Sequence, residues 1–361
     1  MKKILHVSYS MDTGGGPLTI KRIVEDFNEY EYYVSGNPGV FMDHFQTMLP
    51  SSHILKLKGP NLPLNLSLLV KFCNSKSIDI LHVHGRGAAS FARFVKIFIP
   101  KIKVVYTPNG FYPKSLRWPF RAFYVLGERL LLTLTDKVFF VSLSERSTFS
   151  KSLGVKLNNE KFIYIQNYID VNLVQTKSAL PYRHPLNHSP KFLFIGRLSQ
   201  QKGVDILIES LRLVDEDFQV TIIGYGEMEE YLKNEIGKNL INKVTFIGKL
   251  NEAFRYMPNF DALLLPSRFE GLPFTILEAM LYRLPVIVTP CNGTKDLIND
   301  TNGYVAQSIG PGAFAGAIKR FINDFRLNKE SIERIINQNE NLVKSEYSLE
   351  AVNQKINDLY A

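Results

Sequence analysis

The stretch that decides the fold is KFLFIGRLSQQKGVDILIESL, residues 191–211. It begins with a short apolar run rich in Phe and Ile, which is typical of a buried strand. A polar loop of Gly, Ser and Gln follows, and the stretch ends with apolar residues at helical spacing. A strand joined by a loop to a helix is the repeating unit of parallel α/β sheets. The stretch therefore predicts an α/β fold.

Short apolar runs of the same kind recur along the chain and alternate with longer segments of helical period. Five precede the stretch and four follow it: KILHVSYS, DILHVHG, KVVYTPN, KVFFVS and FIYIQN, then QVTIIG, KVTFIG, ALLLPS and PVIVTP. Several end in Gly, Pro, Ser or Asn, which suit loops at the carboxyl ends of parallel strands, where such folds bind ligands. The pattern occurs twice, so we expect two parallel-sheet α/β domains.

A segment of different composition separates the two halves. Residues 172–190, NLVQTKSALPYRHPLNHSP, are rich in Pro, Asn, Ser and His and have no sustained apolar period, which favours a linker. A length of 361 residues suits two domains. We expect an N-terminal domain over residues 1–171, a second domain over 191–340, and a C-terminal helix over 341–361 that packs back on the first domain.

Composition excludes several classes of protein. Hydrophobic residues make up 45% of the chain and charged residues 21%, which indicates a globular protein. No apolar run reaches the roughly 18 residues of a membrane span, and the apolar run of MKKILHVSYS is too short for a signal peptide. Cys73 and Cys291 lie far apart, which favours neither a disulfide nor a zinc site. We expect a cytoplasmic protein, and the composition indicates no metal or other cofactor.

The net charge of +9 points to an anionic partner. Basic and aromatic residues are concentrated between Phe91 and Arg129, which fits the surface of the cytoplasmic membrane. An ordinary solvated helix face with core aromatic residues is the alternative. The chain lacks the RNA-recognition and zinc-finger patterns, and its basic residues lie beside large apolar ones, so we expect no nucleic-acid partner.

The first candidate cluster is the pair of cations in the stretch from residue 191 to 211. Arg197 follows the expected strand, and Lys202 with Gly203 directly precedes the helix. A guanidinium fork, an ammonium and the free N–H groups of a helix start could together hold a diphosphate without a metal ion. Taken alone, the pair would more often be solvated surface cations, and the second cluster of candidate residues reverses that preference.

The second candidate cluster is PSRFEGLPFTILEAM, residues 266–280. Glu270 would lie in a loop after a strand, and Pro273 suits the first turn of a helix. Glu278 would lie in the second turn of that helix, and its side chain leans toward the helix start. Both carboxylates could therefore reach one ligand, where their oxygens suit the vicinal hydroxyls of a sugar. The alternative is two solvated acids, but an unpaired acid within FTILEAML would be costly.

Weaker candidates are glycines and one histidine at expected strand ends. Gly226 and Gly248 follow two strands of the second half, as glycines do in many α/β proteins. Gly15 and Gly16 lie between the first strand and a helix, where backbone can approach a phosphate. The surrounding sequence matches neither the dinucleotide fingerprint nor the Walker pattern. His84 ends a strand in LHVHGRG, where a satisfied structural histidine is the alternative.

Together these motifs resemble the retaining GT-B glycosyltransferases, especially glycosyltransferase family 4. GRLSQQKG is similar to the family pattern G-R-L-x-x-x-K-G, and PSRFEGLPFTILEAM to P-S-x-x-E-G followed by E-A-M. The first half is similar more loosely. The resemblance implies two Rossmann-like domains that face each other across a cleft, the first for the acceptor and the second for a nucleotide-sugar donor.

The resemblance also implies a role for each candidate residue. Arg197 and Lys202 would bind the donor diphosphate and stabilise the charge that grows on it, which is electrostatic catalysis. Glu278 would hold the ribose hydroxyls and Glu270 the transferred sugar. The remaining donor contacts would come from Gly226, Gly248, Gly271, Leu272, Pro273 and Phe274 in the second half, and from Gly15, Gly16 and His84 in the first.

We count His84, Arg197, Lys202 and Glu270 as the catalytic residues. Retention in such sites is explained by front-face attack, in which the leaving phosphate helps to remove the acceptor proton, so no residue acts as a covalent nucleophile. We place Asn109 and Arg86 on the acceptor side. The chain departs from the family in YTPNGF, where many relatives have histidine at position 109, and in IQNYID, where P-N-G is common.

We therefore expect transfer of a hexosyl or N-acetylhexosaminyl group from a UDP-sugar, rather than GDP-mannose, to a glycan. The glycan would be polyprenyl-diphosphate-linked and would belong to bacterial O-antigen, capsule or exopolysaccharide synthesis. A soluble sugar acceptor is the alternative. Other readings are a non-hydrolysing nucleotide-sugar epimerase of similar fold and, from another class, a basic nucleic-acid- or membrane-binding protein without catalysis.

Overall fold

The computed structural model describes residues 1–12, 14–157, 160–174 and 189–361. The chain divides into two compact units. Unit 1 contains Met1–Gln166 together with Asn353–Ala361, and unit 2 contains Asn167–Val352. Most of the expected linker, residues 172–190, lies outside the described residues.

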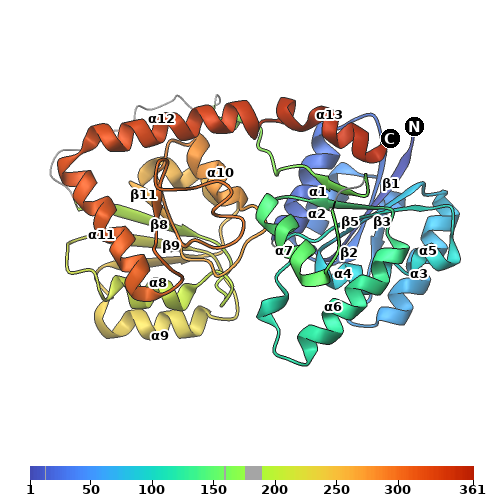
Figure 1. Cartoon of the computed structure of the whole chain (residues 1–361), viewed down its shortest axis with the longest axis horizontal. Coiled ribbons are helices and arrows are strands. Elements are labelled where there is room, and N and C mark those ends of the chain that lie inside the picture. The colour runs from blue at the N-terminus through green and yellow to red at the C-terminus, as the bar shows by residue number, and fades with distance from the viewer. Residues whose placement is uncertain (13, 158–159, 175–188) are drawn as a thin grey trace. The chain divides into compact units, whose positions relative to one another are not determined.

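Unit 1 is built on a parallel sheet whose seven described strands lie in the order β3-β2-β1-β4-β5-β6-β7 (Figure 1). Its register pairs Leu5 of β1 with Leu81 of β4 and with Tyr33 of β2. The strands are β1 (Lys3–Ser10), β2 (Glu31–Asn37), β3 (Ile54–Lys56), β4 (Ile80–His84), β5 (Lys103–Thr107), β6 (Lys137–Phe140) and β7 (Phe162–Tyr164).

Helices connect these strands and cover the sheet. The central strands β1, β4 and β5 are nearly continuous apolar runs because both faces of a parallel sheet are buried. One core cluster packs Leu5, Leu81 and Tyr106 of these strands against Phe91 and Phe149 of the helices. The helices are α1 (Gly15–Asp26), α2 (Val40–Met48), α3 (Leu62–Lys76), α4 (Gly85–Ala92), α5 (Val95–Phe98), α6 (Phe120–Leu131) and α7 (Leu143–Leu153).

Unit 2 repeats this architecture with a parallel sheet of six described strands in the order β10-β9-β8-β11-β12-β13. The strands are β8 (Lys191–Ile195), β9 (Gln219–Ile223), β10 (Val244–Gly248), β11 (Ala262–Leu265), β12 (Val286–Val288) and β13 (Tyr304–Val305). The helices are α8 (Val204–Leu211), α9 (Glu229–Asn239), α10 (Phe274–Leu281), α11 (Pro311–Leu327) and α12 (Lys329–Glu346). Phe192, Phe218 and Phe321 lie at the centre of its core.

The C-terminal segment differs from the single helix expected over residues 341–361. It consists of the end of α12 and a separate helix, α13 (Leu349–Tyr360). The helical backbone is interrupted between them, where the carbonyl oxygen of Tyr347 accepts a hydrogen bond from the backbone N–H of Ile169 at 2.8 Å. Residues 353–361 group with unit 1, where the Tyr360 hydroxyl contacts Nδ1 of His82 at 2.7 Å.

The structure confirms the predicted fold class of two parallel-sheet α/β domains. Three strands, β2, β3 and β13, were not among the predicted runs. β2 contains Ser35 and Gly36 in its interior, which weakens the apolar signal. β3 and β13 are three and two residues long, too short to show a period.

In each sheet the strand order reverses direction at one point. From β1 the chain proceeds outward to β2 and β3, whereas from β4 it proceeds to β5, β6 and β7. In unit 2, β8 leads to β9 and β10 while β11 leads to β12 and β13. Loops that leave neighbouring strands in opposite directions open a crevice at the carboxyl ends, which is the usual ligand site of such sheets. The candidate sites should therefore lie beyond β1 and β4, and beyond β8 and β11.

Among the described residues, no helix combines the length and the apolar composition that crossing a membrane requires.

Candidate functional site

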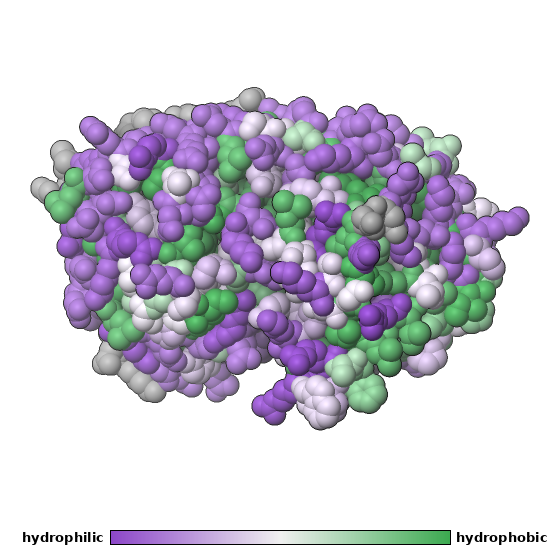
Figure 2. Space-filling view, in the orientation of Figure 1, coloured by the Kyte–Doolittle hydropathy of each residue, from purple (hydrophilic) through white to green (hydrophobic). Residues whose placement is uncertain are grey.

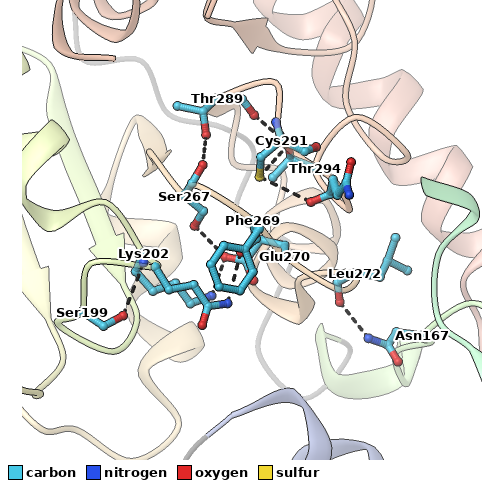
Figure 3. Close-up of polar contacts among 12 residues, drawn as sticks. Asn167, Ser199, Lys202, Ser267, Phe269, Glu270, Leu272, Thr289, Cys291 and Thr294 are labelled. Atoms are coloured by element: carbon cyan, nitrogen blue, oxygen red, sulfur yellow. Dashed lines mark hydrogen bonds and ion pairs between the residues drawn. The ribbon is translucent and has the colours of Figure 1, made fainter. Parts of the chain in front are cut away.

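The crevice of unit 2 contains a cation and a carboxylate in direct contact. Lys202, in the loop after β8, places Nζ 2.7 Å from Oε1 of Glu270, in the loop after β11 (Figure 3). The Ser267 hydroxyl donates a second hydrogen bond to the same oxygen at 2.6 Å. Glu270 is 7% exposed. Two of the predicted residues therefore meet at the switch point of the sheet, although 68 positions separate them in sequence.

The second oxygen of Glu270 is the free acceptor of this pair. Oε2 receives no hydrogen bond from another described residue, whereas Oε1 receives two. An ammonium has three donors, of which Lys202 directs one to Glu270. Lys202 thus keeps donors for the phosphate oxygens of a ligand, and Glu270 keeps an acceptor for a hydroxyl of the same ligand.

An ion pair between two residues that were not predicted as site residues holds the loop after β8 and the loop after β11 together. Arg268 binds Asp205 of α8 through two parallel contacts of 2.7 and 2.6 Å, the bidentate geometry of a strong guanidinium–carboxylate pair. Burial alone would raise the pKa of Asp205, but the hydrogen bonds and charge of Arg268 lower it. Gln201 adds a contact at 3.1 Å to the carbonyl oxygen of Phe269. These contacts fix the position of Lys202 relative to Glu270.

Glycine is required where the loops pass closest to one another. Gly203 precedes α8 with a φ of 69°, and a Cβ there would lie 2.1 Å from the carbonyl oxygen of Pro266. Gly226, in the loop after β9, has a φ of 159°, and its Cβ would lie 2.5 Å from the carbonyl oxygen of Leu198. Because neither position tolerates a side chain, the loops after β8, β9 and β11 form one close-packed layer.

The other predicted donor residues of unit 2 lie around this pair. Arg197 is exposed at the end of β8, and Gly248 ends β10. Gly271 and Leu272 follow Glu270, and the Leu272 carbonyl accepts a hydrogen bond from Asn167 at 2.7 Å. Pro273 is the N-cap of α10 rather than its first residue, and the helix begins at Phe274.

Glu278 lies in the second turn of α10, as predicted, with its residue 8% exposed. All its helix neighbours from Ile276 to Leu281 are buried and apolar. A carboxylate in such surroundings is costly unless polar groups or a ligand accompany it.

In unit 1 the corresponding crevice brings Gly16, His84 and Asn109 together. A Cβ on Gly16 would lie 3.4 Å from Nδ2 of Asn109 and 3.6 Å from Cβ of His84. Nδ2 of Asn109 and Nδ1 of His84 are both buried and have no hydrogen-bond partner among the described residues. Gly15 is exposed beside them in the first turn of α1. Two unsatisfied polar atoms beside a helix start suit a small polar ligand.

The conformation of Asn109 depends on a residue that sequence reasoning did not identify. Asn109 has a φ of 54°, unusual for a residue other than glycine. Oε1 of the buried Glu145 accepts hydrogen bonds from the next two backbone groups, those of Gly110 at 2.5 Å and Phe111 at 2.8 Å. Glu145 therefore holds the loop after β5 in place. Its position after Ser142, the N-cap of α7, was the available sequence signal.

His84 belongs to a cluster of three buried histidines. Its Nε2 lies 3.0 Å from Nδ1 of His6, and its ring centroid is 4.0 Å from that of His82. His82 contacts the hydroxyls of Tyr360 and Thr107, both at 2.7 Å. Burial lowers the pKa of His6 to about 3, and it lowers the pKa of His82 and His84 well below the usual range. All three rings are therefore neutral near pH 7.

The three rings also have the spacing of a metal site, since one nitrogen from each lies within 4.8 Å of the others. Both nitrogens of His82 are already hydrogen-bonded, however, and its ring is completely buried. A metal would have to displace the bond to Tyr360 or to Thr107. The residues fit a hydrogen-bonded core cluster better than a metal centre.

Arg86, placed on the acceptor side from the sequence, lies in the first turn of α4, two residues after His84. Its guanidinium carbon lies 5.6 Å from the ring centroid of Tyr124 on α6. The residue is exposed and makes no hydrogen bond or ion pair with another described residue. It is therefore available to an anionic ligand.

Both halves of the chain match family models of glycosyltransferases. A model described as Glycosyltransferase Family 4 matches residues 28–173, and one described as Glycosyl transferases group 1 matches residues 189–324. An uncharacterized glycosyltransferase of Methanocaldococcus jannaschii is 24% identical over 339 residues, covering 91% of this chain and 90% of the relative. The O-antigen biosynthesis glycosyltransferase WbnH of Escherichia coli is 26% identical over 245 residues, 68% of each chain.

Solved structures show the same fold. The crystal structure of Anabaena HepE in complex with UDP and glucose aligns with a TM-score of 0.80 and 19% identity, covering 100% of this chain and 99% of HepE. The matches to both halves agree with the two parallel sheets and with the residues gathered at their switch points. The chain is therefore a GT-B glycosyltransferase of family 4.

Proposed function

We propose that the protein is a retaining, metal-independent hexosyltransferase that uses a UDP-sugar donor in bacterial surface polysaccharide synthesis. The observation that carries the proposal is the contact of Lys202 with Oε1 of Glu270 at the switch point of unit 2, which leaves Oε2 open. The transferred group would be a hexosyl or N-acetylhexosaminyl residue. The acceptor would be a glycan attached to a polyprenyl diphosphate.

Unit 2 would bind the donor, with its cations on the diphosphate. Arg197 lies just after β8, and Lys202, with two remaining donors, lies two residues before α8, whose first N–H groups have no partner within the helix. These groups together attract a diphosphate and stabilise the charge that develops on it as the glycosidic bond breaks. A site that supplies this charge from side chains and amides does not require a metal ion.

The two acids would position the donor rather than attack it. Oε2 of Glu270 would accept a hydrogen bond from a hydroxyl of the transferred sugar while Ser267 and Lys202 hold Oε1. Glu278 would accept the ribose hydroxyls near the start of α10. Because Glu270 is already engaged by a cation, it is a poor nucleophile, which favours front-face attack assisted by the leaving phosphate.

Unit 1 would contact the acceptor and the reacting sugar. Neutral His84 can accept or donate one hydrogen bond through Nδ1, and Nδ2 of Asn109 is a donor with no partner. Gly15 and Gly16 would allow phosphate to approach the backbone of α1. The basic and aromatic surface of unit 1 would hold the enzyme at the inner face of the cytoplasmic membrane, where a lipid-linked glycan is presented.

The choice of UDP and of polysaccharide synthesis follows the relatives. HepE was crystallised with UDP and glucose, and WbnH is named for O-antigen biosynthesis. The epimerase reading is not favoured, because both matching family models describe glycosyl transferases.

The test is thermal unfolding in the presence of UDP-, GDP- and ADP-sugars with EDTA. A ligand that binds only the folded protein raises the melting temperature, by an amount set by its concentration relative to Kd. We expect a rise with UDP-sugars that EDTA does not remove and that Glu278→Ala diminishes. A matched control is Glu346→Ala, on the exposed end of α12. The absence of a shift with every nucleotide sugar would refute the donor assignment.

The stereochemical part of the proposal has its own test. The anomeric configuration of the product, determined by NMR coupling constants, should equal that of the donor sugar. An inverted product would refute the front-face reaction while leaving the donor site intact.

A further inference from the structure

The N-terminal segment and exposed face of α6 carry a continuous run of large apolar side chains. Trp118, Phe120, Phe123, Leu126 and Leu130 are 76%, 69%, 70%, 55% and 64% exposed. Residues 120, 123, 126 and 130 recur at helical spacing, so they lie along one face of α6. Figure 2 shows hydrophobic residues among hydrophilic ones over the part of unit 1 where Figure 1 places α6. Exposed apolar faces of this size usually bind a partner.

A groove of about 490 Å³ runs beside this face, between α4–α5 and α6. Its volume is within the range of ligand pockets. The apolar part of its lining consists of Phe94, Ile97, Leu130, Leu131 and Leu134. Phe94 and Ile97 are themselves 37% and 57% exposed, so the groove is open to a long apolar ligand.

Arg86 lies on the groove lining together with Ser90. Below them, Glu128 is paired with the buried Arg93 at 2.8 Å, so the floor carries no net charge. Burial raises the pKa of Glu128, although Arg93 lowers it in part. The charge available to a ligand in the groove is therefore that of Arg86. This residue follows His84 of the candidate site by two positions.

The segment of sequence that contains the groove lining is strongly positive. Residues 86–134 contain nine Lys and Arg but one acidic residue, so they carry +8 of the chain's net +9. The side chains of five of these cations make no hydrogen bond or ion pair with another described residue: Arg86, Lys101, Lys114, Arg117 and Arg121. Apolar side chains interleaved with free cations complement a surface that is both anionic and apolar, which is a lipid surface.

We propose that the groove between α4–α5 and α6 binds the hydrocarbon chain of the polyprenyl-diphosphate-linked acceptor, with the diphosphate on Arg86. The apolar face of α6 enters the membrane interface beside it. The inference rests on the proposed glycosyl transfer and assigns the lipid part of its acceptor to this groove of unit 1. Arg86 places the phosphate end of the lipid near His84, and the apolar lining directs the chain toward Leu134.

Short-chain probes separate this proposal from general attraction to anions. Dodecyl phosphate below its micelle concentration should raise the melting temperature of the whole protein, whereas inorganic phosphate and dodecyl maltoside should not. Ile97→Asn and Leu130→Asn should each weaken dodecyl phosphate binding about ten-fold through lost apolar contact. Arg86→Gln should weaken it about five-fold. The matched controls are Leu327→Asn, at a residue 79% exposed on unit 2, and Arg326→Gln.

Flotation with vesicles tests the natural form of the lipid. Binding should rise from phosphatidylcholine vesicles to vesicles with phosphatidylglycerol, and further when a polyprenyl phosphate is added. Equal binding with and without the polyprenyl phosphate would overturn the groove assignment, as would full binding by Leu130→Asn. The nucleotide-sugar shift is measured on the same variants, so unchanged lipid binding by these variants together with an intact UDP-sugar shift contradicts this inference alone, whereas loss of the UDP-sugar shift in the unaltered protein contradicts the proposed function.

Discussion

The buried histidine cluster makes the stability of unit 1 depend on pH, with a sign that the structure determines. His6, His82 and His84 have pKa values lowered by burial, to about 3 for His6. In the unfolded chain each returns to about 6.5. Below pH 6.5 the unfolded state therefore binds more protons than the folded state. The stability contributed by these groups is fully present above pH 6.5 and is lost as the pH falls toward the folded values.

The magnitude follows from linkage. A histidine that stays neutral when folded loses about 1.3 kcal/mol of stabilisation between pH 7 and pH 5.5, so three lose about 4 kcal/mol. The groups that face the cluster, Tyr32, Thr107 and Tyr360, are uncharged and cannot compensate. Glu128, whose pKa burial raises, acts in the opposite direction, by at most one proton. A loss of about 4 kcal/mol is a large part of the stability of an ordinary domain.

Urea unfolding at pH 7, 6 and 5.5 measures this effect, with peptide-level hydrogen exchange assigning the transition to β1 and β4. His6→Phe should reduce the dependence on pH by about one third, because one proton-binding group is removed. His44→Gln, at a side chain about one-third exposed on α2, is the matched control. A free energy of unfolding that is constant from pH 7 to 5.5, or a slope that His6→Phe leaves unchanged, would refute the reasoning.

Three further predictions concern unit 2. Lys202→Met should lower the free energy of unfolding by about 2 kcal/mol, since Glu270 would remain buried without its cation, and Lys202→Met/Glu270→Gln should recover most of it in a double-mutant cycle. Glu278→Ala should raise the Kd for UDP about ten-fold by calorimetry, through loss of charged hydrogen bonds; an unchanged Kd contradicts its assignment to the ribose. Gly203→Ala should destabilise by more than about 2 kcal/mol in urea unfolding, because a Cβ would meet Pro266 at 2.1 Å. Gly248 has a φ of 84° but open space around it, so Gly248→Ala should cost only the backbone strain of a side chain at positive φ, about 1 kcal/mol. Equal losses of stability at positions 203 and 248 would contradict the close approach of Gly203 to Pro266.

Most of the fold could be predicted because it depends on local patterns. Apolar runs such as FLFI and LLLP contain enough consecutive buried residues to identify strands of a doubly covered parallel sheet. The strands that were missed depend on pairing with neighbours: β2 lies between β1 and β3 despite its Gly36, and β13 pairs with β12 over only two residues. Hydrogen bonds to the neighbouring strands stabilise such segments, and the sequence of the segment itself gives no sign of this pairing.

The candidate site was predictable to the level of its residue types but not of its contacts. The motif around Glu270 and the cation at Lys202 could each be identified from local sequence, and the fold then explains why both occur at strand ends. Their direct contact, by contrast, depends on β8 and β11 being neighbours although 68 residues separate the two side chains. The same holds for Tyr360 and His82, which are 278 residues apart.

The contact between Lys202 and Glu270 also changes what the donor site must do. Arg197 and Lys202 bring two positive charges and Glu270 removes one, so the three side chains carry +1 toward a donor diphosphate with two negative charges. Side-chain charge alone therefore does not balance the donor, and the partial positive charge at the amino end of α8 becomes part of the site. Gly203 is what allows that helix end to pack against Pro266. On this argument the glycine of the K-G pair is as necessary to diphosphate binding as the lysine, because it brings the helix amides to the place where the charge is still incomplete.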